Sequence, residues 1–432
     1  MLNRLFISAV LLLLSVLGAS AQTGTWSGKL DVQGTKLTLV FHLDGDKPCV
    51  DSPDQGVKGI PVQVEKNGIS GLLIKIPSLG ASFEGMMVVQ KIVGTFKQGG
   101  LSLPLVLTPG EDKPKRPQTP VGPFPYSQEE VSFVRGDYTF NGTLTLPEGY
   151  SRKTPVLVMV TGSGIQNRDE EIFDHKPFAV IADALARAGV ASLRYDDRGY
   201  GGAAADVATC TADDFKSDAL AAVDMLRERF DKVGVLGHSE GGTIAFLLAA
   251  QKKVDFVVSL AGVVVSGAEA LVWQNRLGLL EAGFAADVVD RYCNALDQAF
   301  KVKVEGGVMP KAENLDLPDV LKQNFLAVLV QIQSPYFAHF LSLDVRKVLT
   351  DVVCPVLAMN GTKDVQVDHV ANLAALREGL VENDKNDVVA VEGVNHLFQR
   401  CATGSVQEYR TIEETIFPEV LGRLVAWVAE FK

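Results

Sequence analysis

From about residue 126 onward, short apolar runs alternate with helical stretches, and this rhythm limits the chain to few folds. The apolar runs lie at residues 155–160, 190–193, 233–236, 256–260, 356–359 and 388–391. Amphipathic helical segments fall between them, for example at 177–188, 213–230 and 240–250. Fully apolar runs of this length are typical of strands covered on both faces. Strand, helix and strand in this order predict an α/β fold with a mostly parallel sheet, which residues 131–134 and 138–146 open as an antiparallel pair.

One interval in this region is too long for a simple crossover. Between Gly262 and about residue 351 the pattern stays helical, so we predict a helical cap inserted at about residues 263–351. Aromatic residues are distributed through this region, among them the seven residues Trp273, Phe284, Tyr292, Phe300, Tyr336, Phe337 and Phe340. We expect most of them to form the core of the cap and a minority to line a pocket at its underside.

Residues 22–107 have a different pattern, which predicts a small all-β domain. Leu37, Leu39, Phe41 and Leu43 alternate with polar neighbours, as antiparallel strands do. Tight turns are expected at residues 45–46, 67–68 and 99–100. Residues 108–125 contain six prolines, which neither pair in a central strand nor continue a helix. This segment is therefore predicted to be the linker to the domain at residues 126–432.

The first 21 residues are predicted to be a signal peptide. A thinly charged start is followed by an apolar run at residues 5–17, which is too short to span a bilayer, and then by Ala19-Ser20-Ala21. We expect cleavage before Gln22 and an exported protein, periplasmic or secreted, with no stable membrane insertion after removal of the signal. An uncleaved N-terminal membrane helix is the alternative.

Composition narrows the classes of partner. The formal net charge of −11 opposes binding to nucleic acid or to anionic membranes, and it leaves a small-molecule substrate open. The five cysteines lie far apart without a CxxC pair, so no metal site and no cofactor is expected. We expect most of them to be buried as small apolar residues, although one or two disulfides are compatible with export. The oligomeric state stays open, and a homo-oligomer is compatible with these features.

The strongest chemical signal is the segment Gly-His-Ser-Glu-Gly-Gly at residues 237–242. It follows the apolar run 233–236 and precedes a helix that begins near Glu240. At a strand-to-helix turn this pattern forms a nucleophile elbow, in which flanking glycines let the serine adopt a strained backbone conformation. Ser239 is therefore the predicted nucleophile. Its position at a helix N-terminus favours developing negative charge.

A serine nucleophile requires a histidine base and a carboxylate that fixes the histidine tautomer. Of the six histidines, His396 alone follows a late predicted strand and can return to the sheet edge, with His369 as the rival. Asp364 follows the run 356–359 at a suitable distance and is the predicted acid. Asp368 is the fallback, since it resembles an N-terminal helix residue.

Acyl transfer also needs two hydrogen-bond donors for the oxyanion. We predict the backbone N–H groups of Glu240 and of Ser163, which lies in the turn after the run 155–160, with Gly164 as second choice for the latter. Two charged clusters, 167–170 and 196–199, follow strands at the same edge. We expect Arg168 and Arg198 to pair with the carboxylates there and brace the loops.

Several motifs resemble the bacterial two-domain carboxylesterases of the α/β-hydrolase superfamily, EstD type. These are GSGIQNRDE at 162–170, RYDDRGYGG at 194–202, GHSEGG at 237–242, SPYFAHFLSLD at 334–344, NGTKDVQV at 360–367 and NHLFQ at 395–399, followed by ATG and IEETI. The resemblance extends from about Tyr126 to the C-terminus, and its triad maps onto Ser239, Asp364 and His396. It implies a serine esterase (EC 3.1.1) for acyl esters, usually short-chain ones. Tyr336 departs from the family pattern, which favours Trp and would give the pocket another shape.

Two other functions fit parts of the sequence. A serine peptidase of the prolyl-oligopeptidase kind shares the triad, but residues 22–107 contain no propeller repeats. Such a peptidase would also need a carboxylate pair or a similar group to hold the substrate amine. A non-catalytic binding protein on a hydrolase scaffold is the third reading, and it is disfavoured because every catalytic position is filled.

Overall fold

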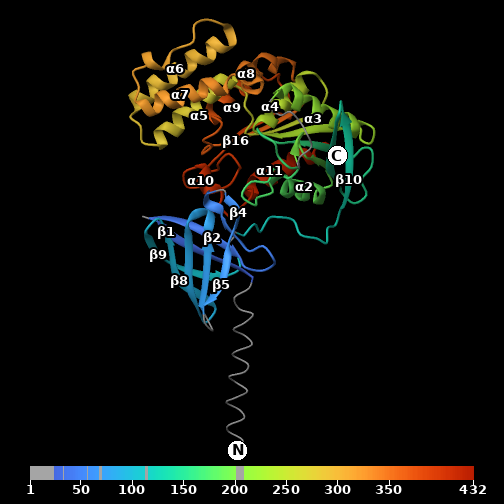
Figure 1. Cartoon of the computed structure of the whole chain (residues 1–432). Coiled ribbons are helices and arrows are strands. Elements are labelled where there is room, and N and C mark those ends of the chain that lie inside the picture. Colours follow the sequence, from blue (N-terminus) through green and yellow to red (C-terminus); the bar gives the residue numbers. More distant parts are fainter. Residues whose placement is uncertain (1–23, 33, 56, 68–70, 112–114, 201–208) are drawn as a thin grey trace, which may run out of the picture. The chain divides into compact units, whose positions relative to one another are not determined.

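The protein is described by a computed structural model over residues 24–432, except residues 33, 56, 68–70, 112–114 and 201–208. The predicted signal peptide at residues 1–21 lies outside the described residues. The chain forms two compact units, Met1–Pro114 and Lys115–Lys432 (Figure 1).

The N-terminal unit is a nine-stranded antiparallel sheet with the strand order β4-β3-β2-β1-β9-β8-β7-β6-β5. The strands are β1 (Thr25–Val32), β2 (Thr35–His42), β3 (Cys49–Ser52), β4 (Val57–Pro61), β5 (Gln63–Asn67), β6 (Gly71–Ile76), β7 (Ala81–Val88), β8 (Lys91–Gln98) and β9 (Leu101–Pro109). The predicted alternation is confirmed, because Leu39 and Phe41 of β2 are buried in one core with Phe83 and Leu107. Gly99 and Gly100 join β8 to β9 with φ of +57° and +83°, a backbone that only glycine adopts readily.

The linker is shorter than the predicted range of residues 108–125, because both ends of that range belong to the compact units. Strand β9 continues to Pro109, where it pairs with Trp26 of β1. From Lys115 onward the chain belongs to the second unit. There, the Arg116 guanidinium donates to the carbonyls of Phe173 and Ile412 at 2.8 Å each. Hydrogen bonds therefore hold the segment after Pro114 against the rest of the second unit.

The second unit contains an eight-stranded sheet in the order β10-β11-β13-β12-β14-β15-β16-β17. The strands are β10 (Ser127–Arg135), β11 (Tyr138–Leu146), β12 (Val156–Val160), β13 (Ala191–Tyr195), β14 (Val233–His238), β15 (Val257–Leu260), β16 (Val356–Gly361) and β17 (Asp387–Val391). The pairs β10–β11 and β11–β13 are antiparallel, and all pairs from β13 to β17 are parallel. The α/β fold predicted from the apolar runs is confirmed.

Helices cover both faces of this sheet (Figure 1). They are α2 (Pro177–Arg187), α3 (Ala212–Arg227), α4 (Glu240–Ala250), α9 (His369–Gly379) and α11 (Pro418–Ala429). The short helix α10 (Val406–Tyr409) lies in the segment between β17 and α11. Alternate residues of β12 separate into two cores, because successive side chains of a strand point to opposite faces. Leu157 packs with Phe178 of α2 and Leu424 of α11, whereas Val158 packs with residues of α3 and α4. Burying each large apolar side chain contributes about 1.5–3 kcal/mol.

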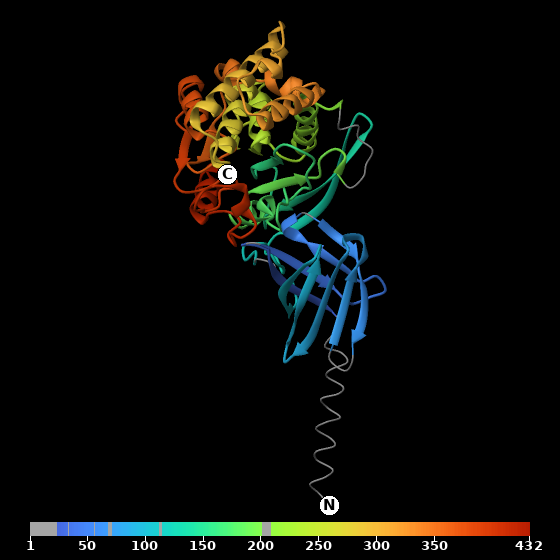
Figure 2. The same ribbon diagram turned by 60° about the vertical axis from the view of Figure 1, so that its left-hand side comes forward.

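The cap consists of α5 (Gly267–Glu281), α6 (Ala286–Glu305), α7 (Asp319–Gln331) and α8 (Pro335–Ser342), which lie together beside the sheet in Figures 1 and 2. It has its own core, built around Tyr292, Phe300 and Phe325. The predicted cap range of about 263–351 is slightly too long. The 3-10 helix at Val345–Asp351 returns to the main unit, where Val345 and Leu349 join the core beneath α4.

The described helices include none that alone has the length and hydropathy of a membrane span, although the sharply bent pair α7 and α8 meets both criteria jointly.

The cysteines, all within the described residues, form no disulfide. Cys210 and Cys293 are buried and the other three are half-buried, so the expectation that most of the cysteines are buried is wrong.

Candidate active site

Ser239 lies at a strained turn between β14 and α4. Its φ is +53° and its ψ is −118°, a conformation that costs a non-glycine residue about 1–3 kcal/mol. The flanking glycines are required by close packing. A Cβ on Gly237 would lie 1.9 Å from the Gly241 carbonyl oxygen, and one on Gly241 would lie 2.1 Å from the Val160 oxygen. The elbow predicted from the sequence thus holds the Ser239 backbone at the end of β14.

Asp364 and His396 lie together, as the sequence predicted. His396 Nδ1 is 2.7 Å from Asp364 Oδ2, and both side chains are almost fully buried. The other carboxylate oxygen of Asp364 accepts hydrogen bonds from the N–H groups of Gln366 and Val367, at 2.7 and 2.9 Å. With these bonds the carboxylate is fixed in place and has its Oδ2 directed at the imidazole.

The loop that carries His396 is held by the residue before it. The buried Asn395 side chain accepts hydrogen bonds from the N–H groups of Leu397 and Gln399, each at 3.0 Å, and donates to the Gln399 side chain. The N–H of Lys363 donates to the carbonyl of Val394 at 3.0 Å, which joins this loop to the one that carries Asp364. The imidazole is therefore positioned by two loops that follow neighbouring strands, β16 and β17.

The two rival residues have a structural role at a helix terminus. Asp368 is the N-cap of α9, where its carboxylate accepts the N–H of Val370 at 2.9 Å. His369 is the first residue of that helix. Asp368 thus has the helix-capping position that the sequence suggested for it.

Ser239 and His396 line one cavity of about 610 Å³ between the sheet edge and the cap. Ser163 also lines it, from the loop after β12. A cavity of this size is typical of sites for small organic molecules. The structure therefore brings Ser163, Ser239 and His396 to one cavity, with Asp364 buried behind the imidazole.

The two predicted oxyanion donors remain available. Within the described residues, neither the Ser163 N–H nor the Glu240 N–H donates a recorded hydrogen bond. Glu240 is the first residue of α4, where N–H groups have no acceptor within the helix. By contrast, the N–H of the neighbouring Gly162 is occupied, because it donates to Glu170 Oε1 at 2.7 Å.

A buried pair, Glu170 and His238, adjoins the site and was not predicted as part of it. His238 Nδ1 lies 2.9 Å from Glu170 Oε1, and its Nε2 lies 3.0 Å from the carbonyl oxygen of His396. Burial alone would lower the pKa of His238, but the charge and hydrogen bond of Glu170 raise it above its usual range. The pair joins three segments, namely the loop after β12, the elbow and the loop of His396.

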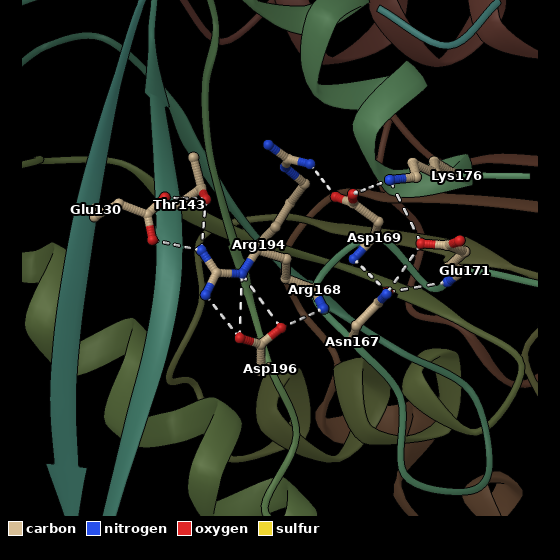
Figure 3. A network of polar contacts seen from close by, with 9 residues as sticks. All are labelled: Glu130, Thr143, Asn167, Arg168, Asp169, Glu171, Lys176, Arg194 and Asp196. Carbon is tan, nitrogen blue, oxygen red and sulfur yellow. Dashed lines mark hydrogen bonds and ion pairs between the residues drawn. The ribbon is translucent and has the colours of Figure 1, made fainter. Parts of the chain in front are cut away.

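Figure 3 shows the charged cluster that follows β12. Arg168 binds Asp196 in a bidentate ion pair at 2.7 Å and reaches Glu130 on β10 at the same distance. Arg194 pairs with Asp169 in the same cluster. Because the Arg168 guanidinium forms ion pairs with both of these carboxylates, the expectation that it braces the loops is confirmed.

Asp197 and Arg198 brace the site differently from what was expected. Arg198 pairs with Asp218 of α3 at 2.6 Å rather than with the carboxylates beside it in the sequence. Asp197 accepts hydrogen bonds from the Thr161 hydroxyl and from the N–H of Gln166, at 2.8 and 2.9 Å. Burial raises the pKa of Asp197 to about 7, although these hydrogen bonds oppose the shift.

The cap contacts the elbow through one hydrogen bond. The Tyr336 hydroxyl of α8 donates to Glu240 Oε2 at 2.7 Å. Burial raises the pKa of the Glu240 carboxyl, and burial beside Glu240 raises that of the Tyr336 hydroxyl. The tyrosine thus supplies a polar link from the cap to the residue after Ser239.

More cap aromatics reach the cavity than the sequence suggested. Of the seven aromatic residues named from the sequence, four line the cavity: Phe300, Tyr336, Phe337 and Phe340. The expectation of a minority is wrong because α8 presents three of its aromatic residues to the cavity. No group of three or more metal-ligating side chains occurs among the described residues.

Comparison with known proteins agrees with this geometry. Residues 157–404, more than half of the chain, match the model of the alpha/beta hydrolase family. The esterase EstD of Thermotoga maritima is 29% identical over 272 residues, which cover 62% of this chain and 60% of that relative. The match thus spans less than two thirds of EstD. It confirms the resemblance to EstD that the motifs indicated.

Solved structures that resemble this chain are more distant from it. An esterase of Pyrococcus furiosus has a TM-score of 0.46 and 16% identity over 74% of this chain and 99% of its own. Est1E of Butyrivibrio proteoclasticus has a TM-score of 0.40 and 18% identity over 70% of this chain and 96% of its own. With its elbow, its mixed sheet and its match over residues 157–404, the chain belongs to the alpha/beta hydrolase family.

Proposed function

We propose that this protein is a serine carboxylesterase that hydrolyses short-chain acyl esters through an acyl-enzyme intermediate. One observation carries the proposal: His396, which Asp364 holds at 2.7 Å from behind, lines a cavity together with Ser239 on its strained elbow. The match with a relative named as an esterase supports the ester as the substrate class.

In the first half-reaction, His396 removes the Ser239 proton while Ser239 Oγ forms a bond to the ester carbonyl carbon. Because the Asp364 carboxylate accepts a hydrogen bond from the Nδ1–H group of His396, the Nε2 atom is left as the base, and the imidazolium that forms is stabilised. The N–H groups of Ser163 and Glu240 stabilise the oxyanion. The C–O bond to the alcohol then breaks, and the alcohol leaves with the proton from His396.

In the second half-reaction, water attacks the acyl-enzyme. His396 takes a proton from the water, whose oxygen bonds to the acyl carbon. The bond to Ser239 Oγ breaks, Ser239 regains its proton from His396, and the carboxylic acid is released. No metal or cofactor is needed for either half-reaction.

The charges of the cavity favour an ester over a peptide with a free amino terminus. An aminopeptidase needs carboxylates to hold the substrate ammonium group. Among the described residues that line the cavity, Glu170 is the one carboxylate, and its Oε1 is bound by His238 and by the N–H of Gly162. This occupancy leaves the walls without a dedicated ammonium site.

The experiment combines labelling with two substrate panels. A fluorophosphonate probe should label the protein at Ser239 and should fail to label the Ser239→Ala variant. Ser132→Ala, which changes an exposed serine on β10, is the matched control and should label normally. Nitrophenyl esters of increasing chain length are compared with aminoacyl anilides, and turnover highest for short esters is expected. Preference for anilides, or full turnover by Ser239→Ala, would overturn the proposal.

A further inference from the structure

Carboxamide side chains are the main polar groups of the cavity outside the elbow region. Six of them line it: Gln166, Gln274, Asn275, Asn324, Gln331 and Gln366. Four belong to the cap helices α5 and α7, and the other two lie in loops at the sheet edge. Ligand cavities are lined mostly by apolar groups with few polar ones. This concentration of amides therefore indicates a ligand that forms hydrogen bonds with them.

Each of the best-held amides is fixed by one hydrogen bond through its nitrogen. Gln274 Nε2 donates to the Gln366 carbonyl at 2.7 Å, and Asn275 Nδ2 donates to the Leu271 carbonyl at 2.8 Å. Gln366 Nε2 donates to the Tyr409 hydroxyl at 3.0 Å. No described residue donates to the side-chain oxygens of these three amides. They are therefore positioned acceptors whose hydrogen-bonding capacity is left for a ligand.

One amide has the opposite orientation. Asn324 Oδ1 accepts a hydrogen bond from the buried Tyr292 hydroxyl at 2.6 Å, which leaves its NH2 group without an acceptor among the described residues. The cavity thus offers oriented acceptors on α5 and a donor on α7. A hydroxyl group both donates and accepts, so several hydroxyls on one ligand match this mixture.

The electrostatics of the cavity argue against a charged ligand. Apart from His396, the ionisable pair that lines it, Glu170 and His238, is joined internally at 2.9 Å. No described lysine or arginine lines the cavity. A carboxylate or an ammonium group would therefore lose its hydration without gaining an opposite charge.

Aromatic rings supply the apolar part of the walls. Tyr336 and Phe340 are stacked on α8 with an interplanar angle of 6°, and Phe337 packs edge-on against Tyr336. Flat aromatic surfaces beside amide groups suit a ring that has apolar faces and a hydroxylated rim.

We infer that the alcohol half of the substrate is an uncharged, polyhydroxylated ring, that is, an acylated sugar, held by the amides of Gln274 and Asn275. The inference rests on the proposed esterase function and adds the class of the alcohol. A purely apolar alcohol of the same size would cover these amides without replacing their hydrogen bonds to water. Each such loss costs about 1–3 kcal/mol, which corresponds to roughly 5-fold to 150-fold in kcat/KM.

The test compares sugars with carbocycles of the same shape. Mono-acetylated methyl glucopyranosides are assayed beside cyclohexyl acetate and cyclohexylmethyl acetate, with nitrophenyl acetate as a common reference. For the wild-type protein, at least one sugar ester should exceed its carbocyclic counterpart by roughly tenfold or more in kcat/KM. Equal or lower kcat/KM for every sugar ester, with nitrophenyl acetate turned over, would overturn the inference and leave the esterase proposal intact. Absence of turnover on all substrates would overturn the esterase proposal itself.

Variants then locate the effect. Gln274→Met and Asn275→Leu keep the side-chain volume and remove the amide, so they should lower kcat/KM for the preferred sugar ester by roughly tenfold while nitrophenyl acetate changes less than threefold. Gln333→Met is the matched control, because Gln333 is exposed and does not line the cavity. An equal loss on both substrates in the α5 variants would contradict a role in binding the sugar. Their thermal unfolding temperatures show whether the fold is retained.

Discussion

The sheet edge and the underside of the cap border the same cavity, but their polar side chains are used in different ways. At the sheet edge, the Asp364 carboxylate has three hydrogen-bond partners and His238 has two. On α5 of the cap, Gln274 and Asn275 have one recorded partner each. Groups with internal partners are positioned before a ligand arrives, whereas groups with spare capacity respond to it. We therefore expect the edge to set the rate of the reaction and the cap to select the substrate.

The largest expected effect comes from Asp364→Asn. An asparagine preserves the shape, but its amide can donate to His396 Nδ1 and so favours the tautomer that lacks a base at Nε2. We expect kcat on nitrophenyl acetate to fall roughly 10⁴-fold with little change in thermal stability.

Asp368→Asn is the matched control for this change, since the rival acid is a helix N-cap and asparagine caps helices equally well. Its activity should remain near that of the wild type. A loss at residue 368 as large as that at residue 364 would contradict the assignment of the acid.

Asp197→Asn should change how stability depends on pH. The folded-state pKa of Asp197 is about 7, above the usual value for an aspartate, so the folded form favours the protonated carboxyl. Its contribution to stability is therefore complete below about pH 4 and is lost as the pH rises through about 7. The loss is on the order of 4 kcal/mol, because each unit of difference in pKa between the folded and unfolded states corresponds to about 1.4 kcal/mol.

Denaturant unfolding of the wild type and Asp197→Asn at several pH values tests this expectation. The uncharged asparagine keeps an acceptor for Thr161 and should flatten the decline between pH 4 and 8. Asp196→Asn, at a half-buried neighbour, provides the comparison. Parallel pH curves for wild type and Asp197→Asn would show that Asp197 does not titrate in this range.

Glu170→Gln tests whether the buried Glu170–His238 pair positions the catalytic loops at the sheet edge. A glutamine oxygen can still accept both hydrogen bonds that Glu170 Oε1 accepts, but without the negative charge it accepts them more weakly. The loop of His396 and the loop of Ser163 therefore lose a charged common anchor. Small displacements of reacting groups cost up to about 10²-fold, and we expect a 10-fold to 100-fold fall in kcat with KM unchanged.

The same variant should also lower the pKa of His238, because Glu170 is what raises it. NMR titration of the imidazole measures this change, which a merely structural loss would not predict. Glu171→Gln, at the exposed neighbouring residue, is the matched control. An unchanged kcat in Glu170→Gln would show that the pair does not position the catalytic residues.

The edge was more predictable from the sequence than the contacts around it. Gly237 and Gly241 are dictated by approaches near 2 Å, so the motif itself specifies the elbow. Asp364 and His396 follow parallel strands, and the carboxyl ends of such strands meet at one edge. Local rules were therefore sufficient to predict that these two residues lie together.

The contacts that sequence reasoning missed depend on how distant segments pass one another. Glu170 and His238 are 68 residues apart, and the path of the loop that brings Glu170 back is set by Arg168 and its partners. Tyr336 and Glu240 are 96 residues apart, and they are in contact because the cap places α8 next to the N-terminus of α4. Tyr336 could be named from the sequence as a residue of the pocket, but its partner Glu240 could not.

Tyr336→Phe should have the smallest effect, and it tests the link between the two regions. The change removes one hydroxyl and leaves the ring in the aromatic wall, so the hydrogen bond to Glu240 is lost at a cost of about 1 kcal/mol. Because Glu240 also supplies a proposed oxyanion N–H, we expect a fall in kcat of up to about fivefold on nitrophenyl acetate. The effect should grow with substrates that contact the cap.

Tyr150→Phe, which removes a hydroxyl that binds Arg229 at the surface, is the control and should leave kcat unchanged. If Tyr336→Phe changed KM for cap-contacting esters and left kcat unaltered for all substrates, the hydroxyl would belong to the selecting region alone, and the two regions would act independently.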